Sequence, residues 1–438
     1  MIAWSFPPEA EVGALRTARF CRFLPEFGIE PIVLTADLSF YKDRDATWPV
    51  PEGIRVERTP VLATPLDWYA KWKGRSISKS VSATGNPVPA QKAAPRFLKR
   101  QLLTALQTPD RYWGWYFPAV RAATEILQRE KINVLFSSGP PWISHLIGRK
   151  LQRNFQIPWI ADFRDPWAYG MTWNLIPSWK RWLDKRLMES CICEAERVIC
   201  NTERFRARLI GAFPQLPEQR FVTITNGINE GTPGLPYVQS RAQKLLLHLG
   251  SLYGGRRIET FCHAVRELVA NKRLDPQTFK VLFVGDMDPS LSSAGEQAAP
   301  DLVKAKIIEF RSRVKWDEAQ NILATADQLL LFFDEPLAVP AKFYEYLQTG
   351  KPILAICKPG ALTDALAATG AGIWADPDDS QGITSRILQL CQMQRRTPAD
   401  VQNSIERYGA KTLTACLANV IHDLAPARTQ PEQPVPIK

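Results

Sequence analysis

Short apolar runs alternate with amphipathic stretches along almost the whole chain. The apolar runs have the length of buried strands, and the stretches between them repeat their apolar positions at helical spacing. Strands that alternate with helices predict parallel sheets covered on both faces. The predicted strands are Met1–Ser5, Ile32–Thr35, Asn133–Ser137, Trp159–Asp162, Val198–Asn201, Val222–Thr225, Leu245–Leu249, Lys280–Val284, Ile307–Phe310, Gln328–Phe333 and Ile353–Ile356. The predicted helices include Ala14–Phe27, Pro118–Lys131, Ser178–Ala195, Ile258–Ala270 and Asp317–Ala326.

The predicted strands form two series, one on each side of a stretch between residues 226 and 244 that is rich in Gly and Pro. Two series predict an α/β protein of two Rossmann-like domains, each with a doubly wound parallel sheet. We expect an N-terminal domain over residues 1–230 and a C-terminal domain over residues 240–424. A length of 438 residues fits this division, because a domain usually spans about 100–200 residues.

Several segments depart from the alternation. A basic insertion at about 74–110 begins with many Ser, Ala, Pro and Lys residues and is expected to be mobile. Residues 289–300 are expected to form a loop, and residues 425–438, with four prolines, a disordered tail. The first strand begins at Met1 itself, so either this strand is short or the true start lies upstream.

Composition narrows the class of protein. The chain is 45% hydrophobic and 23% charged, which is too apolar for a disordered protein. No apolar run of about 18 residues predicts a membrane span, and no secretory signal is evident at the N-terminus. The eight cysteines have no zinc-site spacing, so we expect reduced thiols in a cytoplasmic protein, and only four histidines disfavour a metal centre.

The net charge of +11 predicts an anionic partner, which is nucleic acid, a membrane surface or a phosphorylated ligand. The excess of basic over acidic residues is unevenly distributed along the chain. From Lys71 to Arg111 the chain carries nine basic residues and a single acid, Asp110.

Ligands of doubly wound domains bind beyond the carboxyl ends of the strands. In the first domain, Gly13 stands there before a helical pattern, where a backbone without a side chain can approach an anion. Asp162, Arg164 and Asp165 follow a later strand, and such a cluster suits sugar hydroxyls or developing positive charge. The alternative for the cluster is a helix cap with an internal salt bridge, and position alone does not separate the two interpretations.

In the second domain, a Gly-rich loop follows the first strand and carries Gly250, Ser251, Arg256 and Arg257. Backbone donors and fixed cations together can cradle a diphosphate, whereas the alternative is a surface loop with solvated arginines.

Lys342 and Glu345 are three residues apart and share one face of a predicted helix that Gly350 ends. They can bind a phosphate and a ribose diol together, or form a surface ion pair.

Two Asp-x-Asp patterns, Asp286 with Asp288 and Asp376 with Asp378, can in principle hold a divalent metal under a diphosphate. Asp in such contexts is far more often a turn residue, so no metal is expected.

These motifs resemble, in their order and spacing, the retaining GT-B glycosyltransferases of family 4, over most of the chain up to about His422. The matching segments are Ser5–Pro8 with Gly13, Leu24–Gly28, Ala161–Trp167, Thr225–Gly227, Gly250–Arg257 and Lys342–Pro352. The resemblance implies two Rossmann-like domains facing across a cleft, with the donor nucleotide mainly on the C-terminal domain.

The resemblance also implies roles. Glu345 would bind the ribose of a nucleotide-sugar, Lys342 with Arg256 or Arg257 would bind the diphosphate, and Gly13 would approach the donor from the other domain. Asp162, Arg164 and Asp165 would lie near the acceptor or the anomeric carbon. No cofactor or metal is implied, because protein cations replace the metal at the leaving diphosphate.

Two positions depart from the family pattern. The family often has a second glutamate eight residues before the position of Glu345, where this chain has Leu337 with Glu335 nearby. Ser251 replaces a basic residue that often follows the loop glycine. The first departure concerns contacts to the sugar, and the second concerns one phosphate contact.

The function implied is a hexosyltransferase that moves a sugar, with retention, from a nucleotide-sugar to a glycan or lipid-linked acceptor in cell-surface polysaccharide or glycolipid synthesis. A nucleotide-sugar epimerase of the same fold and a non-catalytic GT-B scaffold are the alternatives. A nucleic-acid-binding protein is disfavoured, because no recognition motif is present.

The segment 92–106 alternates cations with apolar residues at roughly helical spacing. It is either a helix at an anionic membrane surface, through Lys92, Arg96, Lys99 and Arg100, or a core-packing helix with a solvated basic face. The first alternative predicts a cytoplasmic protein attached peripherally to the inner face of a membrane.

Overall fold

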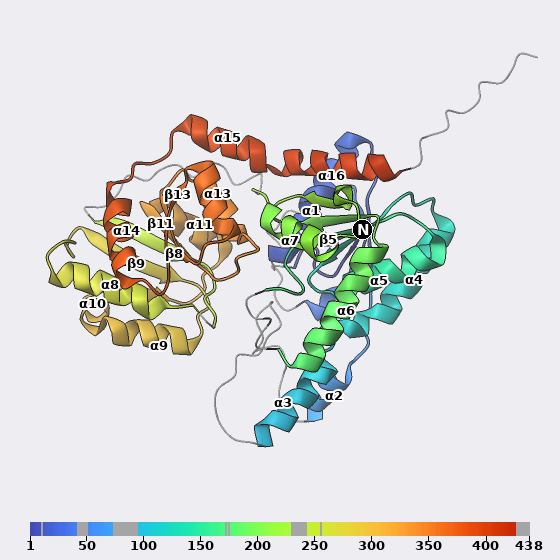
Figure 1. Ribbon diagram of the computed structural model, residues 1–438, viewed down its shortest axis with the longest axis horizontal. Helices are drawn as coiled ribbons and strands as arrows, with labels where there is room; N and C mark the ends of the chain where they lie inside the picture. Colours follow the sequence, from blue (N-terminus) through green and yellow to red (C-terminus); the bar gives the residue numbers. More distant parts are fainter. Residues whose placement is uncertain are drawn as a thin grey trace, which may run out of the picture.

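The computed structural model describes residues 1–9, 12–41, 51–72, 95–170, 173, 176–228, 243–254 and 256–425. These residues form two α/β domains, each built on a parallel sheet with helices on both faces (Figure 1). Most of the predicted basic insertion, residues 73–94, and the predicted tail from residue 426 lie outside the described residues, as do residues 229–242 between the sheets.

The first sheet has seven strands in the order β3-β2-β1-β4-β5-β6-β7, and every pair of neighbours is parallel. The order reverses between β1 and β4, which is the switch point where doubly wound folds bind ligands. The strands are β1 (Ile2–Ala3), β2 (Ile32–Ala36), β3 (Arg55–Thr59), β4 (Leu135–Gly139), β5 (Trp159–Phe163), β6 (Arg197–Cys200) and β7 (Phe221–Thr223).

The second sheet has six parallel strands in the order β10-β9-β8-β11-β12-β13, with its switch point between β8 and β11. The strands are β8 (Lys244–Leu249), β9 (Phe279–Val284), β10 (Ile308–Arg311), β11 (Gln328–Phe333), β12 (Ile353–Cys357) and β13 (Gly372–Ala375). The predicted fold of two doubly wound domains is therefore confirmed.

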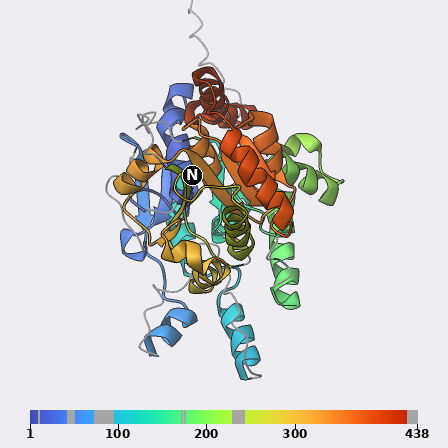
Figure 2. The ribbon, with the colours of Figure 1, turned by 90° about the vertical axis from the view of Figure 1, so that its left-hand side faces the viewer.

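Helices join the strands of both sheets. Those of the first domain are α1 (Val12–Phe23), α2 (Pro65–Trp72), α3 (Pro95–Leu106), α4 (Tyr116–Arg129), α5 (Ile143–Phe155), α6 (Ser178–Glu194) and α7 (Glu203–Ala212), with the 3-10 turns η1 (Leu24–Phe27), η2 (Leu38–Phe40), η4 (Trp113–Trp115) and η6 (Glu218–Arg220). Those that follow are α8 (Ile258–Ala270), α9 (Pro289–Ala298), α10 (Pro300–Lys304), α11 (Trp316–Thr325), α12 (Ala341–Leu347), α13 (Ala361–Thr369), α14 (Ser380–Gln392), α15 (Pro398–Tyr408) and α16 (Ala410–Leu424). In two views at right angles, α2, α3 and α6 project together beyond the first sheet (Figures 1 and 2).

Successive residues of the central strands enter different cores, which is why these strands are apolar throughout. Leu135 and Trp159 pack into one core of the first domain, and Phe136 and Ile160 pack into another on the opposite face. The second sheet is covered on both faces in the same way, with separate cores.

The last helix, α16, does not stay with the second domain. It packs against α1 (Figure 1). Its Leu417 lies in the core of the first sheet with Phe136 and Ile160. The expected C-terminal domain ran to residue 424, but by packing these last residues belong with the first domain. The amphipathic pattern of a helix does not reveal which sheet it covers, and this explains the difference.

The expectation of a loop at residues 289–300 is wrong. Asp288 caps α9 by accepting a hydrogen bond from Ser290 N, and Pro289 occupies the first turn, where a proline is tolerated. Two edge strands, β3 and β13, are additional to the predicted ones.

Candidate functional site

The site in the second domain begins where β8 and β9 end. Gly250 and Gly285 follow these strands with φ values of 151° and 149°, a region that side chains disfavour. A Cβ on Gly285 would collide with the carbonyl oxygen of Gly250. The loops that follow β8 and β9 therefore pack with backbone against backbone. At Gly250 and Gly285 the loop surface carries no side chain.

Lys342 of α12 lies over this loop, because a Cβ on Gly250 would stand 3.6 Å from the Lys342 Cε. The Lys342 ammonium is 2.7 Å from a carboxylate oxygen of Glu345, and both side chains are partly exposed. The prediction that these two residues share one face is confirmed. A cation and a carboxylate thus stand next to each other beside the strand exit.

Arg256 and Arg257 take different directions. The Arg256 guanidinium donates a hydrogen bond to the Ser251 carbonyl at 2.9 Å and lies over the Tyr253 ring. The Arg257 guanidinium instead pairs with Asp378 at 2.7 Å. Of the two arginines, Arg256 is the one that folds onto the loop carrying Ser251.

His248, at the end of β8, was not predicted as a site residue. It is buried, and Nδ1 lies 2.9 Å from the Leu330 carbonyl oxygen, so this nitrogen donates the hydrogen bond. Burial, with a smaller contribution from the charges of Arg256 and Lys342, lowers the pKa of His248 to about 3. Because both charges act on the pKa of His248, Arg256 and Lys342 lie near this buried, neutral histidine.

The segment after β11 meets the first domain. The Thr202 hydroxyl donates a hydrogen bond to the Leu337 carbonyl oxygen at 2.5 Å, and Thr202 also caps α7. A Cβ on Gly170 would stand 2.8 Å from an oxygen of Glu335. Leu337, which departs from the family pattern, and the nearby Glu335 therefore lie at the contact between the domains.

In the first domain, Asp162 is fully buried. The Arg16 guanidinium binds its carboxylate at 2.8–3.2 Å, and the Ser138 hydroxyl donates to it at 2.8 Å. Arg16 also donates to the carbonyls of Ile224 and Thr225. The expectation that Asp162 contacts a ligand is corrected here: of the two alternatives for this cluster, an internal salt bridge describes Asp162.

Arg164 and Asp165 differ from Asp162. Arg164 donates hydrogen bonds to the carbonyls of Gly139 and Pro140, and a Cβ on Gly13 would collide with its guanidinium. Asp165 is exposed, but the protein packed around it desolvates the carboxyl and raises its pKa, against the charges of Arg164 and Arg16. Gly13 and Arg164 thus meet at the end of the first sheet, as the strand-end argument requires.

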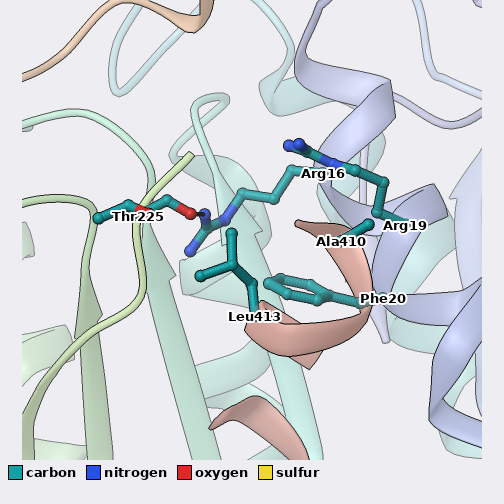
Figure 3. A pocket seen from close by; sticks show the side chains of 6 residues that line it. All are labelled: Arg16, Arg19, Phe20, Thr225, Ala410 and Leu413. Carbon is teal, nitrogen blue, oxygen red and sulfur yellow. Dashed lines mark hydrogen bonds between the residues drawn. The ribbon is translucent and has the colours of Figure 1, made fainter. Parts of the chain in front are cut away.

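A second arginine of α1 reaches toward the second domain. Burial and, to a smaller extent, the charge of Arg16 lower the pKa of Arg19 to about 9, against the opposing influence of Tyr344 and Glu345. Arg16 and Arg19 line a cavity of about 10 Å³ with Thr225, which is about the size of one water molecule (Figure 3). Helix α1 therefore lies close to α12, which carries Glu345.

Residues of both Asp-x-Asp patterns are engaged by other groups of the protein. Lys358 binds Asp376 at 2.7 Å and Asp378 at 2.5 Å, and Asp288 caps α9. Within the described ranges, no group of three or more His, Cys, Asp or Glu residues is arranged to hold a metal ion. The same residues include no helix that is both long and apolar enough to span a bilayer.

Solved structures share this architecture along nearly the whole chain. The lipopolysaccharide outer core galactosyltransferase WaaB is 12% identical, with 96% of this chain and 98% of that chain covered and a TM-score of 0.58. Anabaena Alr3699/HepE in complex with UDP and glucose is 14% identical (96% and 99%, TM-score 0.59). WaaG, a glycosyltransferase involved in lipopolysaccharide biosynthesis, is 15% identical (96% and 99%, TM-score 0.55). These similarities show that the chain has the same fold as these proteins.

Two family models match the chain one after the other. Residues 81–231 match Glycosyltransferase Family 4, and residues 243–393 match Glycosyl transferases group 1. The chain is a glycosyltransferase of the GT-B type. No curated protein sequence matches it.

The candidate site of this glycosyltransferase has two parts. On the second domain, Lys342, Glu345, Gly250, Ser251 and Arg256 lie together, while Arg257 points to an acidic pair. On the first domain, Gly13 meets Arg164, and Asp165 is exposed beside it. Sequence reasoning missed Arg16, Arg19 and His248, whose burial depends on packing that the sequence does not show.

Proposed function

We propose that this glycosyltransferase moves a hexose from a nucleotide-sugar to a glycan or lipid-linked acceptor, with retention, in the synthesis of a cell-surface polysaccharide or glycolipid. The observation that carries the donor assignment is the Lys342–Glu345 pair beside the bare backbone of Gly250. The structures of similar fold include one with UDP and glucose and one with UDP-glucose, which supports a nucleotide-sugar donor.

In this proposal the ion pair between Lys342 and Glu345 opens when the donor binds. Glu345 accepts hydrogen bonds from the ribose hydroxyls, and Lys342 turns to the diphosphate with Arg256, which neutralises the charge of the leaving group. Ser251 offers its hydroxyl where a second cation stands in many relatives. The Gly250 backbone permits close approach of the phosphate oxygens.

In a single displacement, retention requires that the new bond form on the face from which the leaving group departs. The acceptor hydroxyl oxygen bonds to the anomeric carbon, the bond from that carbon to the diphosphate breaks, and the acceptor proton passes to a phosphate oxygen. Arg164 and Asp165 are assigned to the acceptor side, because they lie at the end of the first sheet and Asp165 is exposed. Asp162 supports them through the buried pair with Arg16.

No metal is assigned to this reaction, because Lys342 and Arg256 supply the positive charge that a divalent ion would otherwise bring to the diphosphate. For the acceptor, we propose a lipid-linked glycan and a peripheral position on the cytoplasmic face of a membrane. Two of the similar structures are enzymes of lipopolysaccharide synthesis, and residues 95–106 of the basic segment form helix α3. These observations support a membrane-bound acceptor.

The test is a calorimetric screen of UDP-, GDP- and ADP-sugars, followed by product analysis with and without a lipid-linked acceptor. The proposal expects one sugar-nucleotide to bind in the micromolar range, and NMR to show a product whose anomeric configuration matches the donor. A changed sugar-nucleotide without acceptor would indicate the epimerase, and absence of any nucleotide binding would indicate the scaffold. Inversion at the anomeric carbon would refute the retaining mechanism.

A further inference from the structure

Three helices at one end of the first domain form a common surface. Helices α2, α3 and α6 project in the same direction in both views (Figures 1 and 2), and α2 contacts α3. The indole N–H of Trp179 at the start of α6 donates a hydrogen bond to Gln101 of α3 at 2.7 Å. This contact holds α6 beside α3. The surface of these three helices is called the helix-tip surface below.

Large apolar side chains are exposed on the helix-tip surface. Trp68 of α2 is 64% exposed, Trp182 of α6 is 62% exposed and Leu102 of α3 is 59% exposed, and Trp179 is also accessible. Within the described part of the chain, the other exposed side chains of this kind are Leu62, just before α2, with Phe40 and Phe117. Single exposed apolar residues are ordinary, but several on neighbouring helices mark a surface that another molecule covers.

The charge of the same surface is positive. Residues 178–186 of α6 contain four basic residues and one acid, and residues 95–106 contain three basic residues and no acid. That acid, Asp184, is paired with Lys180 at 2.7 Å. The Arg186 guanidinium lies 5.8 Å from the centre of the Trp182 ring, so a cation accompanies this exposed indole. The surface therefore matches a partner that is anionic at its boundary and apolar beneath.

We propose that the helix-tip surface docks on an anionic lipid membrane. Trp68, Trp182 and Leu102 enter the boundary between headgroups and acyl chains, and the basic residues of α6 meet the lipid phosphates. Indoles favour this boundary because one edge is polar and the ring is apolar. A bilayer also accepts side chains from three separate helices without the shape complementarity that a protein partner needs.

This inference extends the proposed membrane location beyond segment 92–106 and names the side chains that insert. It rests on the proposed function only for its biological purpose, because vesicle binding requires neither donor nor acceptor. The two proposals can therefore fail separately.

The test compares binding to vesicles of phosphatidylglycerol and phosphatidylcholine by co-sedimentation. One variant combines Trp68→Ser, Leu102→Ser and Trp182→Ser, and the matched control is Phe40→Ser. Phe40 is 43% exposed but lies on η2, away from the three helices in the chain. We expect the triple variant to lose at least tenfold in affinity for anionic vesicles, with unfolding midpoint and donor binding unchanged, and the control to bind like the parent protein.

A second measurement detects insertion directly. Lipids brominated near the headgroup end of the acyl chain should quench tryptophan fluorescence of the parent protein more than that of the triple variant. Equal affinity of parent and triple variant for anionic vesicles would overturn the proposal, as would absence of vesicle binding by the parent protein. Self-association that depends on the same three residues, without vesicle binding, would assign the surface to a protein partner instead.

Discussion

The two domains use the same residue types differently at their strand ends. In the first domain, the Asp162 carboxylate is fully buried and binds Arg16 and Ser138. In the second, the Glu345 carboxylate is partly exposed and binds Lys342 alone among the contacts described above. The Arg16–Asp162 pair is part of the buried structure of its domain. The Lys342–Glu345 pair remains accessible to a ligand. Burial, rather than residue type, separates the structural carboxylate of Asp162 from the Glu345 carboxylate that is proposed to bind the donor.

The topology explains this difference. Asp162 belongs to the central strand β5, between β4 and β6, and α1 brings Arg16 to it from 146 positions earlier in the chain. Glu345 belongs to the short helix α12 and meets a partner only three residues away. A buried pair is destabilising once broken, because the remaining charge has no solvent around it. The predictions below test this contrast.

The largest effect is expected from Asp162→Ala. The substitution leaves the Arg16 guanidinium charged and buried, so the free energy of unfolding should fall by about 3–5 kcal/mol. Urea unfolding followed by circular dichroism measures the change. Glu57→Gln, which breaks an exposed pair with Arg55, is the control and should cost no more than about 1 kcal/mol. If Asp162→Ala lowered the free energy of unfolding by less than about 1 kcal/mol, this would contradict the structural role of Asp162.

Glu345→Gln should act on binding and not on folding. Loss of a charged hydrogen bond to the ribose should weaken donor binding by about 1–3 kcal/mol, with the unfolding midpoint unchanged. Titration calorimetry with the donor measures it. Glu309→Gln is a matched control, because Glu309 pairs with Lys280 at the same 2.7 Å and with similar exposure on an edge strand. Unchanged nucleotide affinity in Glu345→Gln would refute the ribose assignment.

Gly13→Ala should have an intermediate effect on turnover. The added Cβ displaces the Arg164 guanidinium, so kcat/KM should fall about tenfold or more. Stability should change by no more than about 1 kcal/mol, because alanine favours a helix such as α1. Steady-state kinetics and urea unfolding of one preparation check both statements. Gly211→Ala, in open space on α7, is the control, and equal kcat/KM in both variants would contradict the assignment.

The smallest effect is expected from a chelator. Protein cations neutralise the diphosphate in the proposed mechanism. Excess EDTA should therefore leave the initial rate unchanged to within about 20%. Initial rates with and without added Mg²⁺ or Mn²⁺ measure this. A strict metal requirement would return attention to Asp376 and Asp378, which bind Lys358 in the structure.

The central strands were predictable from the sequence because they are buried on both faces. Their continuous apolar runs leave one interpretation, as for β5 and β11. The edge strand β3 contains a single apolar residue, Val56, and β13 is only four residues long, so neither has that signal. Helix α9 was missed because its Ser and Ala content hid the cap at Asp288.

The same distinction applies to the site. The Lys342–Glu345 pair was predictable because three residues of helix bring the partners together. The Arg16–Asp162 pair was not, because it depends on the packing of α1 over β5. The neutral state of His248 follows from burial on β8 and from two distant cations, and the sequence specifies neither.

Helix α16 has a consequence for how the protein is made. Leu413, Leu417 and Ile421 complete the core on one face of the first sheet, against Phe136 and Ile160. The ribosome delivers the chain from its N-terminus, and domains usually fold as they emerge. Here that face stays open while the entire second domain is translated, and closes only when the last helix leaves the ribosome. The domain that is synthesised first is completed last.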